Sequence, residues 1–342
     1  MKKITILFAL ISFYTFGQTN PDKPLTNEIY TADPSAHIFD GKIYIYPSHD
    51  VEFGGIPDDS GNQYDMVDYH VLSMDKIGGK VTVHDVGLKV TDVPWATKKM
   101  WAPDAAYKNG TYYLYFPAKD KEDIFRIGVA TSKNPEGPFK AKKKPMKGSY
   151  SIDPAVFIDD DGEAYIYIGG IWGGQLQRWE TGEYEYNGSL RDLNKPNQPA
   201  IKPRMARLTN NMLQFDEELK TIDIIDENGE LIKGGDLSRR FFEAPWIHKI
   251  DKTYYLSYST GDTHLIVYAT SDNPYGPFTY RGVVNEPVKG WTNHHSITKI
   301  DDKWYFFYHD VQRSGKDYLR SVKVRELIHN EDGTIQTINT LK

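Results

Sequence analysis

The segment Asn109-Gly110-Thr111-Tyr112-Tyr113-Leu114-Tyr115 consists of a turn pair followed by an aromatic run. Asn-Gly between apolar runs is the strongest short-range signal for a β-hairpin. Because the apolar run Ala105-Ala106-Tyr107 precedes it, we predict a strand on each side of the turn. Four other segments share this form: Asp40-Gly41-Lys42-Ile43-Tyr44-Ile45-Tyr46, Asp161-Gly162-Glu163-Ala164-Tyr165-Ile166-Tyr167, Asp251-Lys252-Thr253-Tyr254-Tyr255-Leu256-Ser257-Tyr258 and Asp302-Lys303-Trp304-Tyr305-Phe306-Phe307-Tyr308.

Two of these repeats continue with a second shared motif. Residues 130–139 closely match residues 269–278, and both follow a further short apolar run. Each unit therefore has at least three strands, with room for a fourth after the Gly-Pro-Phe turn. Repeats of this length that consist only of strands are typical of propeller blades. A β-sandwich also has short aromatic strands, but it does not explain five similar copies. We predict an all-β fold, a five-bladed β-propeller.

The composition is that of a globular protein, with 39% hydrophobic and 26% charged residues. A net charge of −6 argues against a nucleic-acid-binding protein, which would show a basic surface. The 24 Tyr and 7 Trp residues supply rings that fill pleated surfaces and stack on sugars. The absence of cysteine excludes disulfides, thiolate nucleophiles and cysteine–zinc sites. We expect a monomer that binds no nucleic acid.

The N-terminus has the pattern of a secretory signal. Met1-Lys2-Lys3 is basic, residues 4–16 are almost wholly apolar, and residues 17–20 are small or polar. The apolar run is too short to span a bilayer as a helix. We therefore expect a signal peptide over residues 1–18 and one catalytic propeller domain over residues 19–342. The protein would be exported, periplasmic or secreted, without membrane insertion after removal of the signal.

Carboxylates occupy similar places in three of the repeats. Asp33 and Asp153 each come just before a short first strand, and Glu243 lies in Phe241-Phe242-Glu243-Ala244-Pro245-Trp246. Ala102 and His294-His295 hold the corresponding places in the other two repeats. The innermost strands of a propeller line its central channel, so these residues should converge at one mouth. An Asp-Pro pair can also simply start a turn.

Convergent carboxylates can bind a metal or cleave a glycosidic bond. A Glu among aromatic rings has a raised pKa because desolvation disfavours its charged form, and a raised pKa suits a general acid near neutral pH. Hydrolysis with inversion also needs a carboxylate that activates water, roughly 6.5–9.5 Å from the acid. A third acid can orient the sugar and raise the pKa of the general acid by like-charge repulsion.

From about residue 27 to its end the chain resembles glycoside hydrolase family 43, the five-bladed arabinofuranosidases and xylosidases. The motifs that carry the resemblance are Tyr30-Thr31-Ala32-Asp33-Pro34, Met100-Trp101-Ala102-Pro103-Asp104, Ser151-Ile152-Asp153-Pro154, Phe242-Glu243-Ala244-Pro245 and Asn293-His294-His295-Ser296. The resemblance implies that Asp33 is the general base, Asp153 the orienting and pKa-modulating acid, and Glu243 the general acid. It also implies that Arg320 meets the substrate and that His294 faces a channel that can hold a calcium ion. We expect that the chemistry itself requires no cofactor.

For several residues the sequence allows both a functional and a structural interpretation. We expect Trp101 and Trp246 to be sugar-stacking walls, although Trp in a strand-rich protein is more often core. His295 could be the inward residue in place of His294, since its spacing matches that of Asp33, and would then meet the substrate. Arg320 could instead form a surface pair at a strand edge, and His294 could be a polar plug of the channel.

The predicted function is inverting hydrolysis that releases terminal α-L-arabinofuranosyl or β-D-xylosyl units from plant or algal polysaccharide-derived glycans. The related fructoside-cleaving propellers use Asn-Asp-Pro-Asn, Arg-Asp-Pro and Glu-Cys, from which Ala32-Asp33-Pro34-Ser35, Ile152-Asp153-Pro154 and Glu243-Ala244 all depart. The alternatives are a glycan-binding propeller without activity, a propeller glycosidase of different sugar specificity and a metal-dependent hydrolase built on the same acids. Specificity should reside in loops such as residues 51–65 and 171–198.

Overall fold

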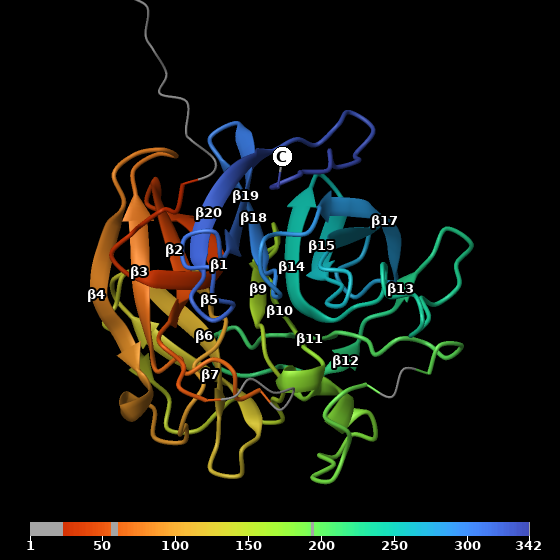
Figure 1. Ribbon diagram of the computed structural model, residues 1–342, viewed down its shortest axis with the longest axis horizontal. Coiled ribbons are helices and arrows are strands. Elements are labelled where there is room, and N and C mark those ends of the chain that lie inside the picture. The colour runs from red at the N-terminus through yellow and green to blue at the C-terminus, as the bar shows by residue number, and fades with distance from the viewer. Residues whose placement is uncertain (1–22, 56–60, 193–194, 342) are drawn as a thin grey trace, which may run out of the picture.

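The computed structural model describes residues 23–55, 61–192 and 195–341. These residues form five sheets arranged in a ring, a five-bladed β-propeller (Figure 1). The prediction of fold class is confirmed. The expected signal peptide, residues 1–18, lies outside the described residues.

We number the sheets as blades in chain order. Blade 1 contains β1 (Tyr30–Phe39), β2 (Lys42–Asp50), β3 (Asp68–Met74) and β4 (Thr82–Lys89). Blade 2 contains β5 (Asp104–Lys108), β6 (Thr111–Lys119), β7 (Phe125–Ser132) and β8 (Lys140–Ala141). Blade 3 contains β9 (Ala155–Ile158), β10 (Ala164–Ile168), β11 (Arg204–Arg207) and β12 (Lys220–Thr221).

Blade 4 contains β14 (Glu243–Ile250), β15 (Thr253–Ser259), β16 (Ile266–Ser271) and β17 (Phe278–Asn285), with β13 (Ile224–Ile225) added parallel to β17. Within the described ranges blade 5 contains three strands, β18 (His295–Ile300), β19 (Lys303–Asp310) and β20 (Ser321–Leu327). Among the described residues the helices are short 3-10 turns, η1 (Val90–Asp92), η2 (Trp172–Gly174) and η3 (Leu176–Trp179). None of the helices in this part of the chain combines the length and apolar character needed to cross a membrane.

The predicted hairpin turns fold as their sequences require. Asn109 and Gly110 join β5 to β6 with φ values of 52° and 71°, and Asp40 and Gly41 join β1 to β2 with φ values of 50° and 75°. Positive φ at both central residues is the mark of the turn whose twist matches that of paired strands. These dipeptides therefore fix the register of the first two strands in blades 1 and 2.

The repeated tyrosines of the second strands connect neighbouring blades. Tyr46, Tyr115 and Tyr167 are almost fully buried, and each hydroxyl donates to a backbone carbonyl of the next part of the ring: to Pro135, Met212 and Pro274 at 2.7, 2.8 and 2.7 Å. A buried Tyr combines a large apolar ring with a hydroxyl that needs a partner. The periodic aromatics in the sequence thus serve inter-blade packing.

The ring closes between the first and last blades. The backbone N–H of Thr31 in β1 donates to the Arg320 carbonyl, and the N–H of Ala36 donates to Ser296 Oγ of β18. Asp104, the last residue of the Met100–Asp104 motif, is a second inter-blade link. Its carboxylate accepts from Ser35 of blade 1 and from the backbone N–H of Val156 in blade 3. These contacts bring the beginnings of the innermost strands to one mouth.

Candidate active site

Breaks in strand pairing place two of the predicted acids. The β1–β2 register shifts between Ala32 and Ser35, which encloses Asp33, and the β14–β15 register shifts between Glu243 and Trp246. Pro34 and Pro245 lie inside these irregularities, where a strand tolerates a residue without an N–H. Asp33 has a φ of 49°, and Asp153, just before β9, has a φ of 57°. Bulges re-aim side chains next to active sites, so the local distortion turns these carboxylates out of the ladder.

Asp33 is held as a carboxylate. Arg320 Nη1 donates to its Oδ1 at 3.0 Å, Ser48 donates to its Oδ2, and its backbone N–H donates to His309 Nδ1 at 3.0 Å. Burial opposes ionisation, but the charge of Arg320, together with His309, His294 and the Ser48 hydrogen bond, lowers the pKa of Asp33 to about 2. Asp33 is therefore ionised at neutral pH and can accept a proton.

Arg320 is itself clamped from the other side. Its Nε and Nη2 donate to the two oxygens of Asp50 at 2.9 and 2.8 Å, a bidentate pair, and its guanidinium lies 4.4 Å from the centre of the Tyr64 ring. The charges of Asp33 and Asp50 outweigh burial and raise the pKa of Arg320. A fixed cation thus lies beside the base.

The pKa of Glu243 is shifted in the opposite direction to that of Asp33. Burial first, and the negative charge of Asp33 second, raise the pKa of Glu243 to about 8 against the opposing charge of Arg320. Glu243 is therefore protonated at neutral pH, as the sequence predicted for a carboxyl among rings. Two carboxyls at one cavity with pKa values driven apart are the signature of an acid and a base.

Asp153 lies between the segment that carries Glu243 and the His294 ring. Its Oδ2 accepts a hydrogen bond of 2.9 Å from the backbone N–H of Ala244, the residue after Glu243, and so fixes the backbone that carries the acid. Burial, followed by the charges of Glu243 and Asp33, raises the pKa of Asp153 well above its usual range. His294 Nδ1 lies 3.8 Å from Asp153 Oδ2 and 3.9 Å from Asp33 Oδ1.

The His294 imidazole is neutral and lies between two acids, too far from either for a hydrogen bond. Burial lowers the pKa of His294 to about 4, although the Asp33 charge acts in the other direction. A metal ligand must be a deprotonated ring nitrogen, so a neutral His294 beside the Asp33 carboxylate supplies the donor types of a cation site.

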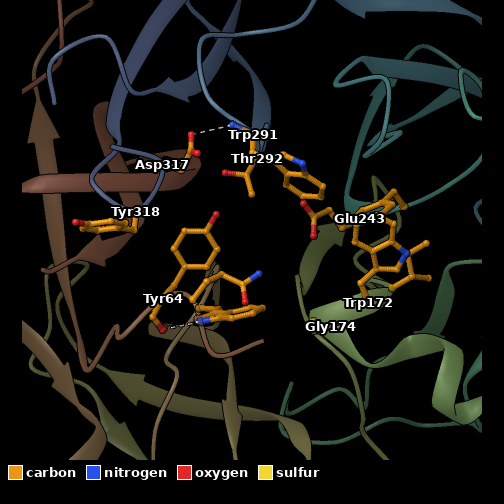
Figure 2. A pocket seen from close by; sticks show the side chains of 13 residues that line it. Tyr64, Trp172, Gly174, Glu243, Trp291, Thr292, Asp317 and Tyr318 are labelled. Atoms are coloured by element: carbon orange, nitrogen blue, oxygen red, sulfur yellow. Dashed lines mark hydrogen bonds between the residues drawn. The ribbon is translucent and has the colours of Figure 1, made fainter. Parts of the chain in front are cut away.

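The residues enclose two adjoining spaces. Asp33, Asp153, Glu243, His294 and Arg320 all line the inner one, so the structure brings together every predicted catalytic residue. The outer space is an open cavity of about 270 Å³ that shares Tyr64, Trp101, Glu243 and Thr292 with the inner one. Its further lining residues are Gln63, Ile171, Trp172, Gly173, Gly174, Phe242, Trp291, Asp317 and Tyr318. In Figure 2 the Glu243 carboxyl and the Tyr64 hydroxyl point into this cavity.

Two sequence expectations need correction. Trp246 is 7% exposed and lines neither space; its ring packs against His37 and its indole N–H donates to the Ile297 carbonyl. His295 is fully buried, bonded to Ser257 through Nε2 and stacked on Phe306. Both side chains therefore pack between strands, and neither is placed to meet a substrate. Trp101 does line both spaces.

The sequence did not single out several residues of the site. Trp172 and Trp291 form an aromatic wall with Phe242, with ring centres 5.0–5.8 Å apart. Trp172 lies in the 171–198 loop that was expected on the functional face, and Tyr64 lies in the 51–65 loop. Asp50 is the last residue of β2 and His309 the next-to-last residue of β19, two strands predicted from their aromatic residues. A polar residue at the end of such a strand was the signal that could have identified them.

Comparison with known proteins agrees with this geometry. The chain matches the family model described as glycosyl hydrolases family 43 over residues 22–335. It is 56% identical to a xylosidase/arabinosidase 43A of Humicola insolens over 92% of this chain and 98% of that one. It is 54% identical to a xylosidase/arabinosidase of Bacteroides ovatus over 90% of this chain and 95% of the relative.

Solved structures show the same relationship. A family 43 β-xylosidase/α-arabinofuranosidase from a compost microbial metagenome, in complex with xylotriose, superposes with a TM-score of 0.91 at 64% identity, covering 93% of this chain and 97% of that one. A family 43 enzyme from Xanthomonas citri, complexed with xylotriose, has a TM-score of 0.87 at 52% identity, with 93% of each chain covered. The protein with the Asp33, Asp153 and Glu243 constellation is a glycosidase and belongs to glycosyl hydrolase family 43.

Proposed function

We propose that the protein removes terminal β-D-xylosyl or α-L-arabinofuranosyl units from plant or algal polysaccharide-derived glycans, with inversion at the anomeric carbon. The observation that carries this proposal is the pairing of an ionised Asp33 with a protonated Glu243 at one cavity. The names of the relatives, xylosidase/arabinosidase and β-xylosidase, support the choice of sugars.

Each acid has one role in the reaction. Glu243 gives its proton to the glycosidic oxygen as the bond to the anomeric carbon breaks, and Asp33 takes a proton from the water that attacks the opposite face of the sugar. Arg320 keeps Asp33 ionised until then. Asp153 holds the Ala244 N–H and so fixes the position of Glu243. Exchange with solvent afterwards returns Asp33 to its carboxylate and Glu243 to its acid form.

The test is a panel of aryl glycosides with purified variants. Asp33→Asn and Glu243→Gln should each lower kcat/KM for the preferred aryl xyloside or arabinofuranoside by about 10²–10⁴-fold, because each removes one proton transfer. Asp272→Asn and Glu331→Gln, at exposed positions, are the matched controls and should keep wild-type activity. A glycan-binding protein would bind xylo-oligosaccharides without turnover, and its Asp33 and Glu243 variants would change affinity alone.

We further propose that His294 can hold a channel ion together with water, an ion that would supply positive charge near the two acids. The neutral imidazole between Asp33 and Asp153 supports this. Proton transfer as described uses only carboxyl groups of this chain, so no cofactor is assigned to it. Activity should survive dialysis against a chelator. Complete loss that Ca²⁺ restores would favour the metal-dependent alternative.

We also propose export, periplasmic or secreted, on the basis of the basic start and apolar run of residues 1–16. Mass spectrometry of the mature protein recovered from an exporting host should show cleavage near residue 18. Retention of Met1 in protein recovered from the exported fraction would contradict the assignment.

A further inference from the structure

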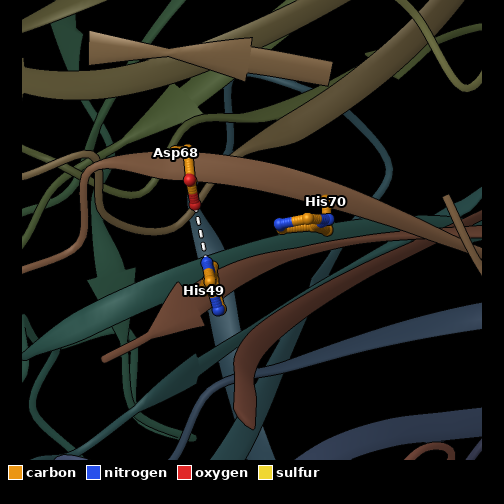
Figure 3. Close-up of side chains that lie close together, drawn as sticks. All are labelled: His49, Asp68 and His70. Atoms are coloured by element: carbon orange, nitrogen blue, oxygen red, sulfur yellow. Dashed lines mark hydrogen bonds and ion pairs between the residues drawn. The ribbon is translucent and has the colours of Figure 1, made fainter. Parts of the chain in front are cut away.

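A cluster of three potential metal ligands lies in blade 1, outside both spaces of the active site. His49 is near the end of β2, and Asp68 and His70 are in β3 (Figure 3). One ligand atom from each of the three lies within 4.8 Å of the other two. His49 Nδ1 is 2.6 Å from Asp68 Oδ1, and the His49 and His70 rings meet edge to face at 4.9 Å. The side chains of His49 and Asp68 are each 17% exposed, so solvent reaches the cluster.

His70 is already oriented as a ligand. Its Nδ1 lies 2.8 Å from the backbone carbonyl of His84, and since a carbonyl only accepts, Nδ1 must carry the proton. The lone pair of the neutral ring is therefore on Nε2. A histidine that donates one ring N–H to a backbone carbonyl while the other nitrogen faces a carboxylate and a second histidine has the outer-shell arrangement of metal-binding histidines.

We propose that His49, Asp68 and His70 bind a divalent transition-metal ion of the zinc type. Two imidazole nitrogens and one carboxylate oxygen suit Zn²⁺, whereas Ca²⁺ and Mg²⁺ prefer sets of oxygens. In a tetrahedral zinc site with bonds of about 2.0–2.2 Å, two ligand atoms are about 3.3 Å apart. The observed ligand atoms lie within 4.8 Å of one another, and binding would bring them to that spacing. The ion would replace the proton between His49 Nδ1 and Asp68 Oδ1, and water would occupy the exposed fourth position.

The position of the cluster gives it a consequence for the active site. His49 and Asp68 flank the connection between β2 and β3, which brings Gln63 and Tyr64 to the substrate cavity. Tyr64 covers Arg320, and its carbonyl accepts from the Trp101 indole. An ion bound by His49 and Asp68 would join the two ends of this connection.

The experiment uses the full mature chain, freed of metal by chelator and dialysed. Zn²⁺ is titrated by calorimetry, and Co²⁺ is added separately to record the visible absorption of a tetrahedral site. His70→Gln and Asp68→Asn remove one ligand each. His84→Gln is the matched control, because its backbone carbonyl still orients His70 while its own ring is outside the cluster. Circular dichroism establishes that each variant is folded, and His294 is intact in all of them.

We expect the wild type and His84→Gln to bind one more equivalent of Zn²⁺ than His70→Gln and Asp68→Asn, or to bind it at least about tenfold more tightly. Zn²⁺ should raise the Tm of the first pair by about 2 °C or more and leave that of the second pair unchanged. Ca²⁺ should not compete. Equal Zn²⁺ stoichiometry and affinity in the wild type and a folded His70→Gln variant would overturn the proposal, as would no Zn²⁺ binding by the wild type at about 100 μM.

Discussion

Replacing either catalytic carboxyl by an amide should lower activity strongly, and the two replacements should change stability in opposite directions. The folded protein raises the pKa of Glu243 from 4.5 to about 8 and lowers that of Asp33 from 3.8 to about 2. Glu243 therefore stabilises the fold only while it is protonated, and that contribution is lost as the pH rises from 4.5 through about 8. Asp33 behaves in the reverse sense, because its contribution is complete above pH 3.8 and is lost as the pH falls through about 2.

The size of each effect follows from these values. At about 1.36 kcal/mol per pKa unit, ionised Glu243 destabilises the fold by at most about 5 kcal/mol. Solvent reaches part of this half-buried side chain, so we expect Glu243→Gln to be more stable than the wild type by about 2 kcal/mol or more near pH 9. The same conversion predicts that Asp33→Asn is less stable by about 2 kcal/mol near pH 7, because Arg320 loses a charged partner.

Denaturant unfolding followed by tryptophan fluorescence measures both effects, at about pH 5, 7 and 9. Glu243→Gln should gain stability over the wild type as the pH rises, while Asp33→Asn remains below the wild type throughout. A Glu243→Gln variant that is no more stable than the wild type near pH 9 would contradict the raised pKa of Glu243, and so would an Asp33→Asn variant that is more stable than Glu243→Gln.

Three further predictions rest on the same site. The pH profile of kcat/KM should have its alkaline limb near pH 8, where Glu243 loses its proton, and its acidic limb near pH 2, where Asp33 gains one. An alkaline limb that persists in a residually active Glu243→Gln enzyme would contradict the role of Glu243 as the general acid. Arg320→Met should move the acidic limb of the kcat/KM profile to higher pH, because the pKa of Asp33 rises without the guanidinium. It should also lower the free energy of unfolding in denaturant by about 3–5 kcal/mol, because Asp50 is left buried and unpaired. Gly261→Ala should destabilise the protein more than Gly110→Ala in thermal unfolding. Both glycines have φ near 70°, but only at Gly261 would the added Cβ lie 2.1 Å from the ring of Phe242, the residue before Glu243. Equal losses of Tm would show that the Phe242 ring moves aside without cost.

The fold could be predicted from the sequence because the motifs that specify it are local and repeated. Asn109-Gly110 and Asp40-Gly41 fix hairpin turns by themselves, and the tyrosines that follow recur because every blade must pack on the next. The three acids were found for the same reason, since Asp33, Asp153 and Glu243 hold equivalent places in three blades.

What the sequence could not predict depends on contacts between distant segments. Trp101 and Trp246 each lie in one of the motifs, but they end in different surroundings. Trp246 packs against His37 instead of lining the cavity, and this contact between distant segments cannot be seen in the sequence. Asp50 and His309 acquire roles through Arg320 and the backbone of Asp33, which are more than 200 residues away along the chain. Trp172 and Trp291 come from loops without periodicity, and no pattern places such residues.

The central claim is that Glu243 supplies a proton to the leaving oxygen while Asp33 activates water on the opposite face of the sugar. Proton NMR of the first-formed product tests it most directly, with an aryl β-D-xyloside and the wild-type enzyme, read before mutarotation. We expect α-xylose to appear first and β-xylose only later. If β-xylose appears first, the reaction proceeds with retention, and Asp33 does not act as the base of a single displacement.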